Sequence, residues 1–139
     1  MARIISIDYG RKRSGIAVTD PSRIIASPLT TVSTHELLDF LKKYISEEDV
    51  DCIVIGEPKQ MDNTASEAEQ FIKPFIKQLM KAYPDMKIER VDERFTSMMA
   101  SQVILDSGIN KKGRRDKALV DKVSAAIILQ SYLDTIKKY

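Results

Sequence analysis

Three acidic segments follow apolar runs that read as buried strands. Asp8 follows the run IISI, the turn GEP at 56–58 follows CIVI, and the segment DER at 92–94 follows KIERV. In open α/β sheets ligands bind beyond the carboxyl ends of parallel strands, so we expect these acids to meet at one rim. A single strand-end acid can instead be a simple turn former. Three such acids at one edge indicate a shared function.

A fourth acid, Asp121, falls on the apolar stripe of a helix predicted from about 116 to 136. The stripe consists of Ala118, Asp121 or Lys122, Ala125, Ile128 or Leu129, and Tyr132. A carboxylate that faces the core is costly unless it is paired or bound to a cation. Asp121 is therefore either the partner of a buried arginine or a metal ligand. The small residues at 124–126 would let this helix approach the sheet closely.

The chemistry that such acids support is metal-dependent hydrolysis. Carboxylate oxygens suit Mg²⁺ or Mn²⁺, and the lone Cys52 and lone His35 leave few softer ligands. Two such ions can activate a water and stabilise the leaving oxygen of a phosphodiester. Basic clusters at 11–13 and 111–117 would hold the phosphates if they converge on the acids; otherwise they are solvated loops. The residues thus point to hydrolysis of nucleic acid.

The elements that must position these residues follow an α/β pattern. Strands are expected at 3–8, 14–20, 23–32, 50–58 and 86–94, and helices at 33–49, 64–82, 96–108 and 116–136. Ser33 with Glu36, and Thr64 with Glu67, fit capping boxes, whereas Pro74 should kink or split its helix. The order predicts a five-stranded mixed sheet flanked by helices, with three antiparallel N-terminal strands and two further parallel strands.

Length and composition indicate one domain over residues 1–139. The chain is 43% hydrophobic and 30% charged, which is typical of a globular protein rather than a disordered one. No apolar run approaches the roughly 20 residues of a membrane span, and the N-terminal apolar stretch is too short for a signal peptide. A single cysteine fits a reducing compartment. We therefore expect a cytoplasmic protein with no membrane partner.

Four motifs, taken together, resemble one known family. They are DYGRKRSGIAVTD at 8–20, IVIGEPKQMDNT at 53–64, VDERFTS at 91–97 and DKVSAAIILQSYL at 121–133. In this order and over essentially the whole chain they resemble the YqgF family, also called RuvX-type Holliday junction resolvases, some of whose members are described as pre-16S rRNA nucleases. The resemblance implies a ribonuclease H-like fold. Glu57 departs from the family pattern, where an apolar residue is common; it is either an extra rim acid or a structural variant, and no catalytic role is assigned to it.

The same resemblance implies the site residues. Asp8, Glu93 and Asp121 would be the catalytic acids and would bind two Mg²⁺ or Mn²⁺ ions, with no small-molecule cofactor. Asp92 is the alternative to Glu93, because neighbours on a strand face opposite sides. The residues expected to contact nucleic acid are Tyr9, Arg11, Lys12, Arg13, Arg94, Lys111, Lys112, Arg114 and Arg115.

Three classes of function are compatible with these residues. The first is a nuclease that processes the 5′ end of pre-16S rRNA in ribosome biogenesis, or else resolves Holliday junctions in DNA recombination and repair. The second is a phosphotransferase or ATPase, because DYGRKRSG also resembles the first phosphate loop of actin-like and sugar kinases. The third is a non-catalytic nucleic-acid or transcription adaptor. The residues do not distinguish RNA from DNA, or a monomer from a homodimer.

Neutralising Arg114 and Arg115 together tests the second basic cluster. The double variant should bind nucleic acid more weakly and with a flatter salt dependence, because fewer counterions are released from the phosphates. The measurement is a titration of labelled nucleic acid at several salt concentrations. An unchanged salt slope would assign the cluster to solvated surface.

Overall fold

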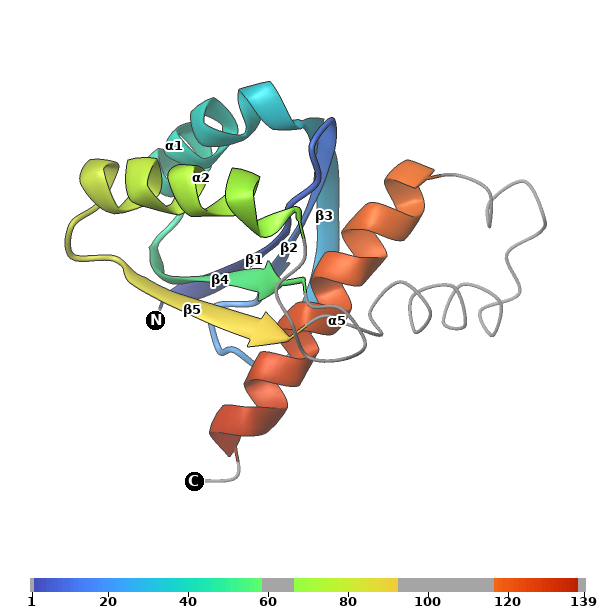
Figure 1. The fold of residues 1–139 in the computed structure, drawn as a ribbon. Coiled ribbons are helices and arrows are strands. Elements are labelled where there is room, and N and C mark those ends of the chain that lie inside the picture. The colour runs from blue at the N-terminus through green and yellow to red at the C-terminus, as the bar shows by residue number, and fades with distance from the viewer. Residues whose placement is uncertain (1, 59–66, 93–116, 138–139) are drawn as a thin grey trace.

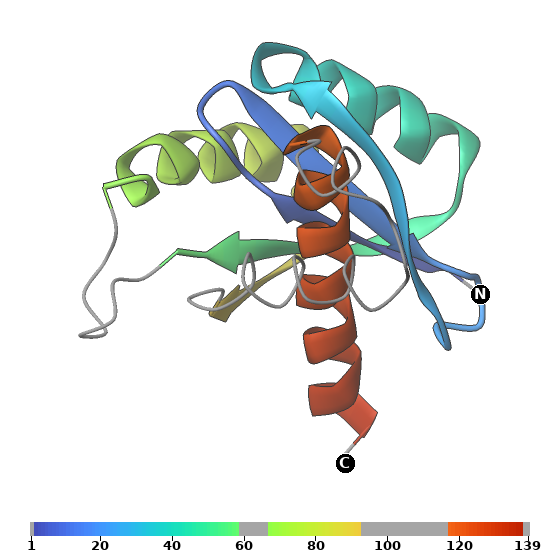
Figure 2. The same cartoon turned by 90° about the vertical axis from the view of Figure 1, so that its right-hand side faces the viewer.

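The computed structural model describes residues 2–58, 67–92 and 117–137. In it, a sheet is covered by α1 and α2 on one face and by α5 on the other (Figures 1 and 2). The elements are β1 (Arg3–Asp8), β2 (Arg13–Thr19), β3 (Ala26–Ser33), the 3₁₀ turn η1 (Thr34–Glu36), α1 (Leu37–Glu47), β4 (Val50–Glu57), α2 (Glu69–Ala82), β5 (Lys87–Asp92) and α5 (Lys117–Lys137).

The sheet has the strand order β3-β2-β1-β4-β5. β1 pairs with β2 and β2 with β3 in antiparallel fashion, whereas β1–β4 and β4–β5 are parallel pairs. The predicted mixed sheet is therefore confirmed. Because β1, β4 and β5 run in the same direction, Asp8, Glu57 and Asp92 all stand at their carboxyl ends. Glu57 lies opposite Asp92 in the register of the β4–β5 ladder. The three strand ends therefore lie at one edge of the sheet, as expected.

Alternation along the strands divides the core into two clusters. In β1, Ile5 and Ile7 pack with α1 and α2, whereas Ile4 packs with α5. In β4, Ile53 and Ile55 belong to the first cluster, and Cys52 and Val54 to the second. Both faces of these central strands are apolar because helices cover both, as the continuous apolar run of β4 predicted.

Helix α5 lies in direct contact with the backbone of the sheet. The Ser6 hydroxyl donates a 2.5 Å hydrogen bond to the carbonyl of Ala125. A Cβ atom added to Gly15 would overlap the carbonyl group of Asp121 and lie 2.7 Å from the Lys122 nitrogen. This confirms the close approach that the small residues of α5 predicted. Gly15 lies in β2, opposite Asp8 of β1, and has no side chain that would hold α5 away from the sheet.

Several helix boundaries differ from the sequence-based expectation. Ser33 makes no side-chain capping bond, because the 3₁₀ turn η1 comes between it and α1. α2 begins at Glu69, and Thr64 lies outside the described residues. Pro74 does not split α2, which continues to Ala82. Pro74 removes one bond to the carbonyl of Gln70, and both residues are exposed, so water can satisfy that carbonyl.

The ends of other elements also shift. β3 begins at Ala26 because Asp20 accepts the backbone N–H groups of Ile24 and Ile25 and so closes a turn before it. Ala118 is exposed rather than part of the buried stripe of α5, whose buried residues begin at Ser124. The helix predicted at 96–108 lies outside the described residues. Among the helices that are described, none is long and apolar enough to cross a membrane.

Replacing Gly15 by alanine tests the close contact between α5 and the backbone of β2. The added methyl group meets backbone rather than a flexible side chain, so α5 must move, and we expect a loss of roughly 1–3 kcal/mol in the free energy of unfolding. Urea denaturation measures this loss. Ser27→Ala, at an exposed position in β3, is the control and should change stability by less than about 0.5 kcal/mol. A Gly15→Ala protein as stable as wild type would contradict the close contact.

Candidate active site

Strand alternation turns Asp8 toward α5. Ile4 packs against the α5 cluster and Ser6 bonds to α5, so Asp8, two residues further on, faces the same helix. Its neighbour across the β1–β2 ladder is Gly15, and Gly15 lies directly beneath the backbone of Asp121. The structure therefore brings Asp8 and Asp121, which are far apart in sequence, to one corner of the sheet.

Asp121 is held by an arginine from β2. The Nε atom of Arg13 donates to Oδ2 of Asp121; the Arg13 side chain is 40% exposed and that of Asp121 is 22% exposed. An arginine partner is one of the two alternatives that the sequence left open, although this arginine is not buried. A carboxylate has two oxygens and accepts several bonds, so the pairing leaves Asp121 able to bind a cation as well.

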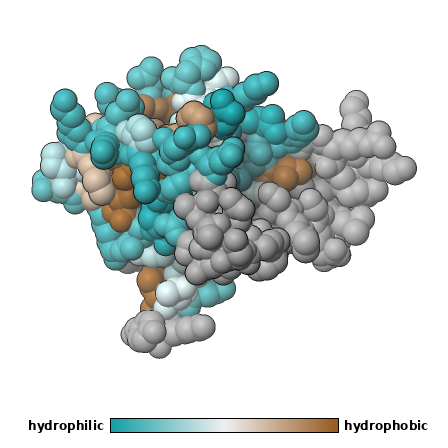
Figure 3. Space-filling view, in the orientation of Figure 1, coloured by the Kyte–Doolittle hydropathy of each residue, from teal (hydrophilic) through white to brown (hydrophobic). Residues whose placement is uncertain are grey.

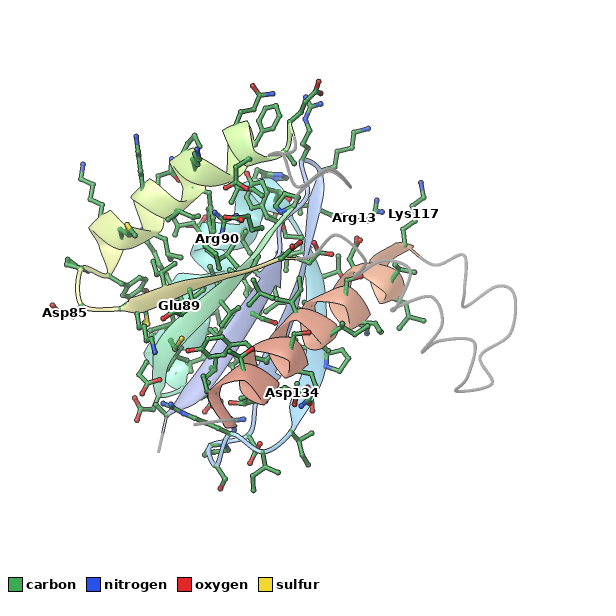
Figure 4. All side chains as sticks on the ribbon, turned by 60° about the horizontal axis from the view of Figure 1, so that its bottom comes forward. Arg13, Asp85, Glu89, Arg90, Lys117 and Asp134 are labelled. Carbon is green, nitrogen blue, oxygen red and sulfur yellow. The ribbon has the colours of Figure 1, made fainter. Side chains whose placement is uncertain are left out.

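The loop between β1 and β2 surrounds this corner with positive charge. An open pocket of about 580 Å³ is lined by Gly10, Arg11, Lys12, Arg13 and Asp121. The pocket therefore combines a carboxylate with three cationic side chains. Figure 4 shows Arg13 at the end of α5 that carries Lys117, while Asp134 lies at the other end of that helix.

The backbone of the same loop is anchored to the start of η1. Thr34 donates its hydroxyl to the carbonyl of Gly10 at 2.6 Å, and its N–H group to the carbonyl of Lys12 at 3.0 Å. A Cβ atom on Gly10 would overlap the carbonyl of Arg13, so the loop closes tightly only with glycine there. These contacts fix the positions from which the three cations project.

Tyr9 takes a different position from Arg11, Lys12 and Arg13. Its ring packs against Phe75 of α2, with 5.3 Å between the ring centroids, and it belongs to the cluster on the α1–α2 side. Burial raises the pKa of Tyr9 above its usual value. Strand alternation explains the placement, because Tyr9 follows Asp8 and faces the opposite side. Tyr9 does not line the pocket that Arg11, Lys12 and Arg13 share with Asp121.

Arg90 ties the end of β4 to β5 and α2, a role that the sequence did not reveal. It donates to the carbonyls of Ile55 and Gly56 at 3.2 and 3.0 Å, and makes a bidentate pair with Glu69 at 2.7 and 3.0 Å. Glu69 is only 6% exposed. The Glu57 carboxylate also lies 3.9 Å from Arg90. Glu57 thus has a structural partner in Arg90.

Other predicted site residues lie outside the described part of the chain. They are Glu93, Arg94, Lys111, Lys112, Arg114 and Arg115. Within the described ranges, no three His, Cys, Asp or Glu side chains gather as a metal site. Asp8 and Asp121 are the two members of the predicted triad that the structure places. Cys52 is buried and burial raises its pKa, whereas the His35 side chain is 81% exposed.

Comparison with known proteins decides the family. The model of the RuvX family, described as a Holliday junction resolvase, matches residues 2–135. The chain belongs to the RuvX family. A Bacteroides fragilis protein named "Putative pre-16S rRNA nuclease" is 58% identical, over 97% of this chain and 98% of its own. A Phocaeicola vulgatus protein of the same name is also 58% identical, over 100% and 99%. The family resemblance drawn from the four motifs is thereby confirmed.

A solved structure confirms the fold of this RuvX protein. Thermus thermophilus RuvC, in complex with a Holliday junction substrate, superimposes with a TM-score of 0.60, covering 99% of this chain and 97% of RuvC. The two sequences are only 14% identical, so the likeness shows the fold alone. The fold is ribonuclease H-like, as the motifs implied.

Removing Arg90 tests its role at the sheet edge. Arg90→Met leaves the carboxylate of Glu69 buried without its partner, and we expect the free energy of unfolding to fall by about 3 kcal/mol. The double variant Arg90→Met/Glu69→Met removes both charges and should recover much of this loss. Urea denaturation of the wild type, both single variants and the double variant gives the coupling energy. A coupling energy near zero would contradict the buried pair.

Proposed function

We propose that this RuvX protein is a metal-dependent endonuclease that cuts structured nucleic acid. The observation that carries the proposal is the convergence of Asp8, Asp121 and the basic loop 11–13 at one corner of the sheet. Phosphodiester hydrolysis needs anionic ligands for cations beside cationic groups for phosphates, and this corner supplies both. The family whose model matches residues 2–135 is described as a Holliday junction resolvase, which favours a nuclease over a phosphotransferase.

Asp8, Glu93 and Asp121 are the proposed ligands of two Mg²⁺ or Mn²⁺ ions. Carboxylate oxygens are the donors that these ions prefer, and the corner opens to solvent through the pocket beside Asp121. Bound divalent cations would supply an activated water and charge stabilisation for the leaving oxygen. Arg13 orients the carboxylate of Asp121, and Arg11, Lys12 and Arg13 line the pocket that would hold the substrate phosphates.

The choice of Glu93 over Asp92 gains support from β5. Val91 packs against the α5 cluster, whereas Arg90 reaches toward α2. Alternation therefore turns Asp92 toward the α2 side, away from Asp8 and Asp121. The residue after Asp92 is the better candidate for the third ligand, and Glu93 stays a prediction.

The proposed substrate is the precursor of 16S rRNA, cut at its 5′ end during ribosome biogenesis in the cytoplasm. The support is the name that the Bacteroides fragilis and Phocaeicola vulgatus relatives carry. A Holliday junction in DNA is the second candidate, because the family model is described by that activity. Either substrate presents a folded phosphate backbone to the basic loop. A homodimer stays a prediction, and analytical ultracentrifugation would measure the oligomeric state.

Asp8→Asn tests the proposal. The change removes a metal ligand while keeping the side-chain shape, so cleavage should fall by roughly a hundredfold or more, since even outer-shell changes at metal sites cost 10–100-fold. Binding should be kept or strengthened, because one negative charge is lost. The assay incubates wild type and variant with pre-rRNA fragments and with synthetic four-way junctions, with and without Mn²⁺.

The matched control is Asp134→Asn, which makes the same change at an exposed position at the far end of α5 (Figure 4). It should cleave like wild type. If Asp8→Asn also cleaves like wild type, Asp8 is not a metal ligand and the proposal is wrong.

A further inference from the structure

A second hollow lies on the opposite side of the basic loop, between the loop and helix α2. It measures about 360 Å³, within the roughly 300–1,000 Å³ of ligand pockets. Three aromatic residues line it, Tyr9, Phe71 and Phe75, together with the cationic Arg11 and the polar side chains of His35 and Gln78. The proposed cleavage reaction uses none of the three aromatic rings.

Phe71 and Arg11 form a platform at this hollow. The guanidinium carbon of Arg11 lies 4.5 Å from the centre of the Phe71 ring, a cation–π contact. Phe71 is 36% exposed, although a phenylalanine on an amphipathic helix would ordinarily face the core. The contact therefore holds two flat groups at the surface.

Two further aromatic rings, those of Tyr9 and Phe75, line the hollow and contact each other. Phe75 is 7% exposed and its ring contacts that of Tyr9 at 5.3 Å between centroids. His35 and Gln78 are exposed and carry hydrogen-bonding groups at the hollow. An occupant with a flat apolar face and a polar edge matches this lining.

Arg11 connects the hollow to the candidate active site. It lines both the 360 Å³ hollow and the 580 Å³ pocket that contains Asp121. A strand whose phosphates contact Lys12 and Arg13 therefore passes beside the aromatic hollow. On the face drawn in Figure 3, the hydrophobic surface of the described residues is divided into small separate areas. Among the residues that line the hollow, Phe71 is the one exposed large hydrophobic side chain, so the hollow fits a narrow ligand better than a broad apolar protein interface.

We propose that the Phe71–Arg11 hollow binds one unpaired nucleobase of the substrate strand. The inference rests on the proposed function, since it assumes that nucleic acid crosses the basic loop. Unpaired bases stack on aromatic rings and on arginine planes, and their edges are read by polar side chains. A paired base cannot leave its stack to enter the hollow without an energetic cost. The hollow would therefore direct cleavage to sites beside a loop, bulge, end or branch point.

The test uses the full chain carrying Asp8→Asn, so that binding is measured without cleavage. The probes are a short single-stranded RNA with one 2-aminopurine, whose fluorescence falls on stacking, and the same RNA with an abasic site there. In this background Phe71→Ala removes the platform, Phe71→Tyr keeps a ring, and Met80→Ala changes another exposed apolar residue of α2 as the control. Circular dichroism confirms that each variant is folded.

We expect Phe71→Ala to abolish the fluorescence change and to weaken binding of the base-containing RNA roughly tenfold, as loss of one stacked base does. Binding of the abasic RNA should be unchanged, while Phe71→Tyr and Met80→Ala should behave like the parent. If Phe71 only orients Arg11 toward phosphate, Phe71→Ala weakens binding of both RNAs equally, and the inference is wrong. It is equally wrong if neither RNA binds, or if Phe71→Ala has no effect.

A parallel cleavage assay uses the wild-type protein, which keeps Asp8, in the presence of Mn²⁺. Its result distinguishes a failure of this inference from a failure of the proposed function. Cleavage with no effect of Phe71 on 2-aminopurine stacking overturns the base-binding hollow alone. A Phe71-dependent signal without cleavage by the wild-type chain supports the hollow and overturns the nuclease proposal.

Discussion

The contact between α5 and the backbone of β1 and β2 is the constraint on which the rest of the site depends. Gly15 leaves room for the carbonyl of Asp121, and the hydroxyl of Ser6 binds the carbonyl of Ala125 one turn further along the helix. Larger side chains at this interface would hold the helix further from the sheet. The carboxylate of Asp121 would then move away from the end of β1. The site is thus a consequence of helix packing as much as of its acids.

The two faces of the sheet carry different groups of residues. The α5 face carries Asp8 and Asp121, whereas the α1–α2 face holds the larger apolar cluster and the Arg90–Glu69 pair. The loop between β1 and β2 borders both faces, since Arg11 lines a hollow on each side. That position would let a single short loop connect the proposed phosphate binding at the acids with the proposed binding of a base on the other face.

Local patterns in the sequence predicted much of this arrangement. The apolar runs located the strands, and the misplaced acid in the stripe of α5 singled out Asp121. The side of the sheet that Tyr9 faces could also have been found, because alternation from Asp8 fixes it. Contacts between distant residues could not be found this way. The Arg13–Asp121 and Arg90–Glu69 pairs and the seat of α5 on Gly15 depend on which helix covers which strand, and no local periodicity contains that information.

The central claim is that Asp8 and Asp121 hold a divalent cation together at the corner that α5 closes. Anomalous X-ray diffraction from crystals of the protein soaked in Mn²⁺ tests it most directly, because the signal locates the ion independently of any activity. We expect an anomalous peak within coordination distance of carboxylate oxygens from both Asp8 and Asp121. Mn²⁺ that binds only elsewhere on the protein, or through only one of these two residues, would contradict the claim.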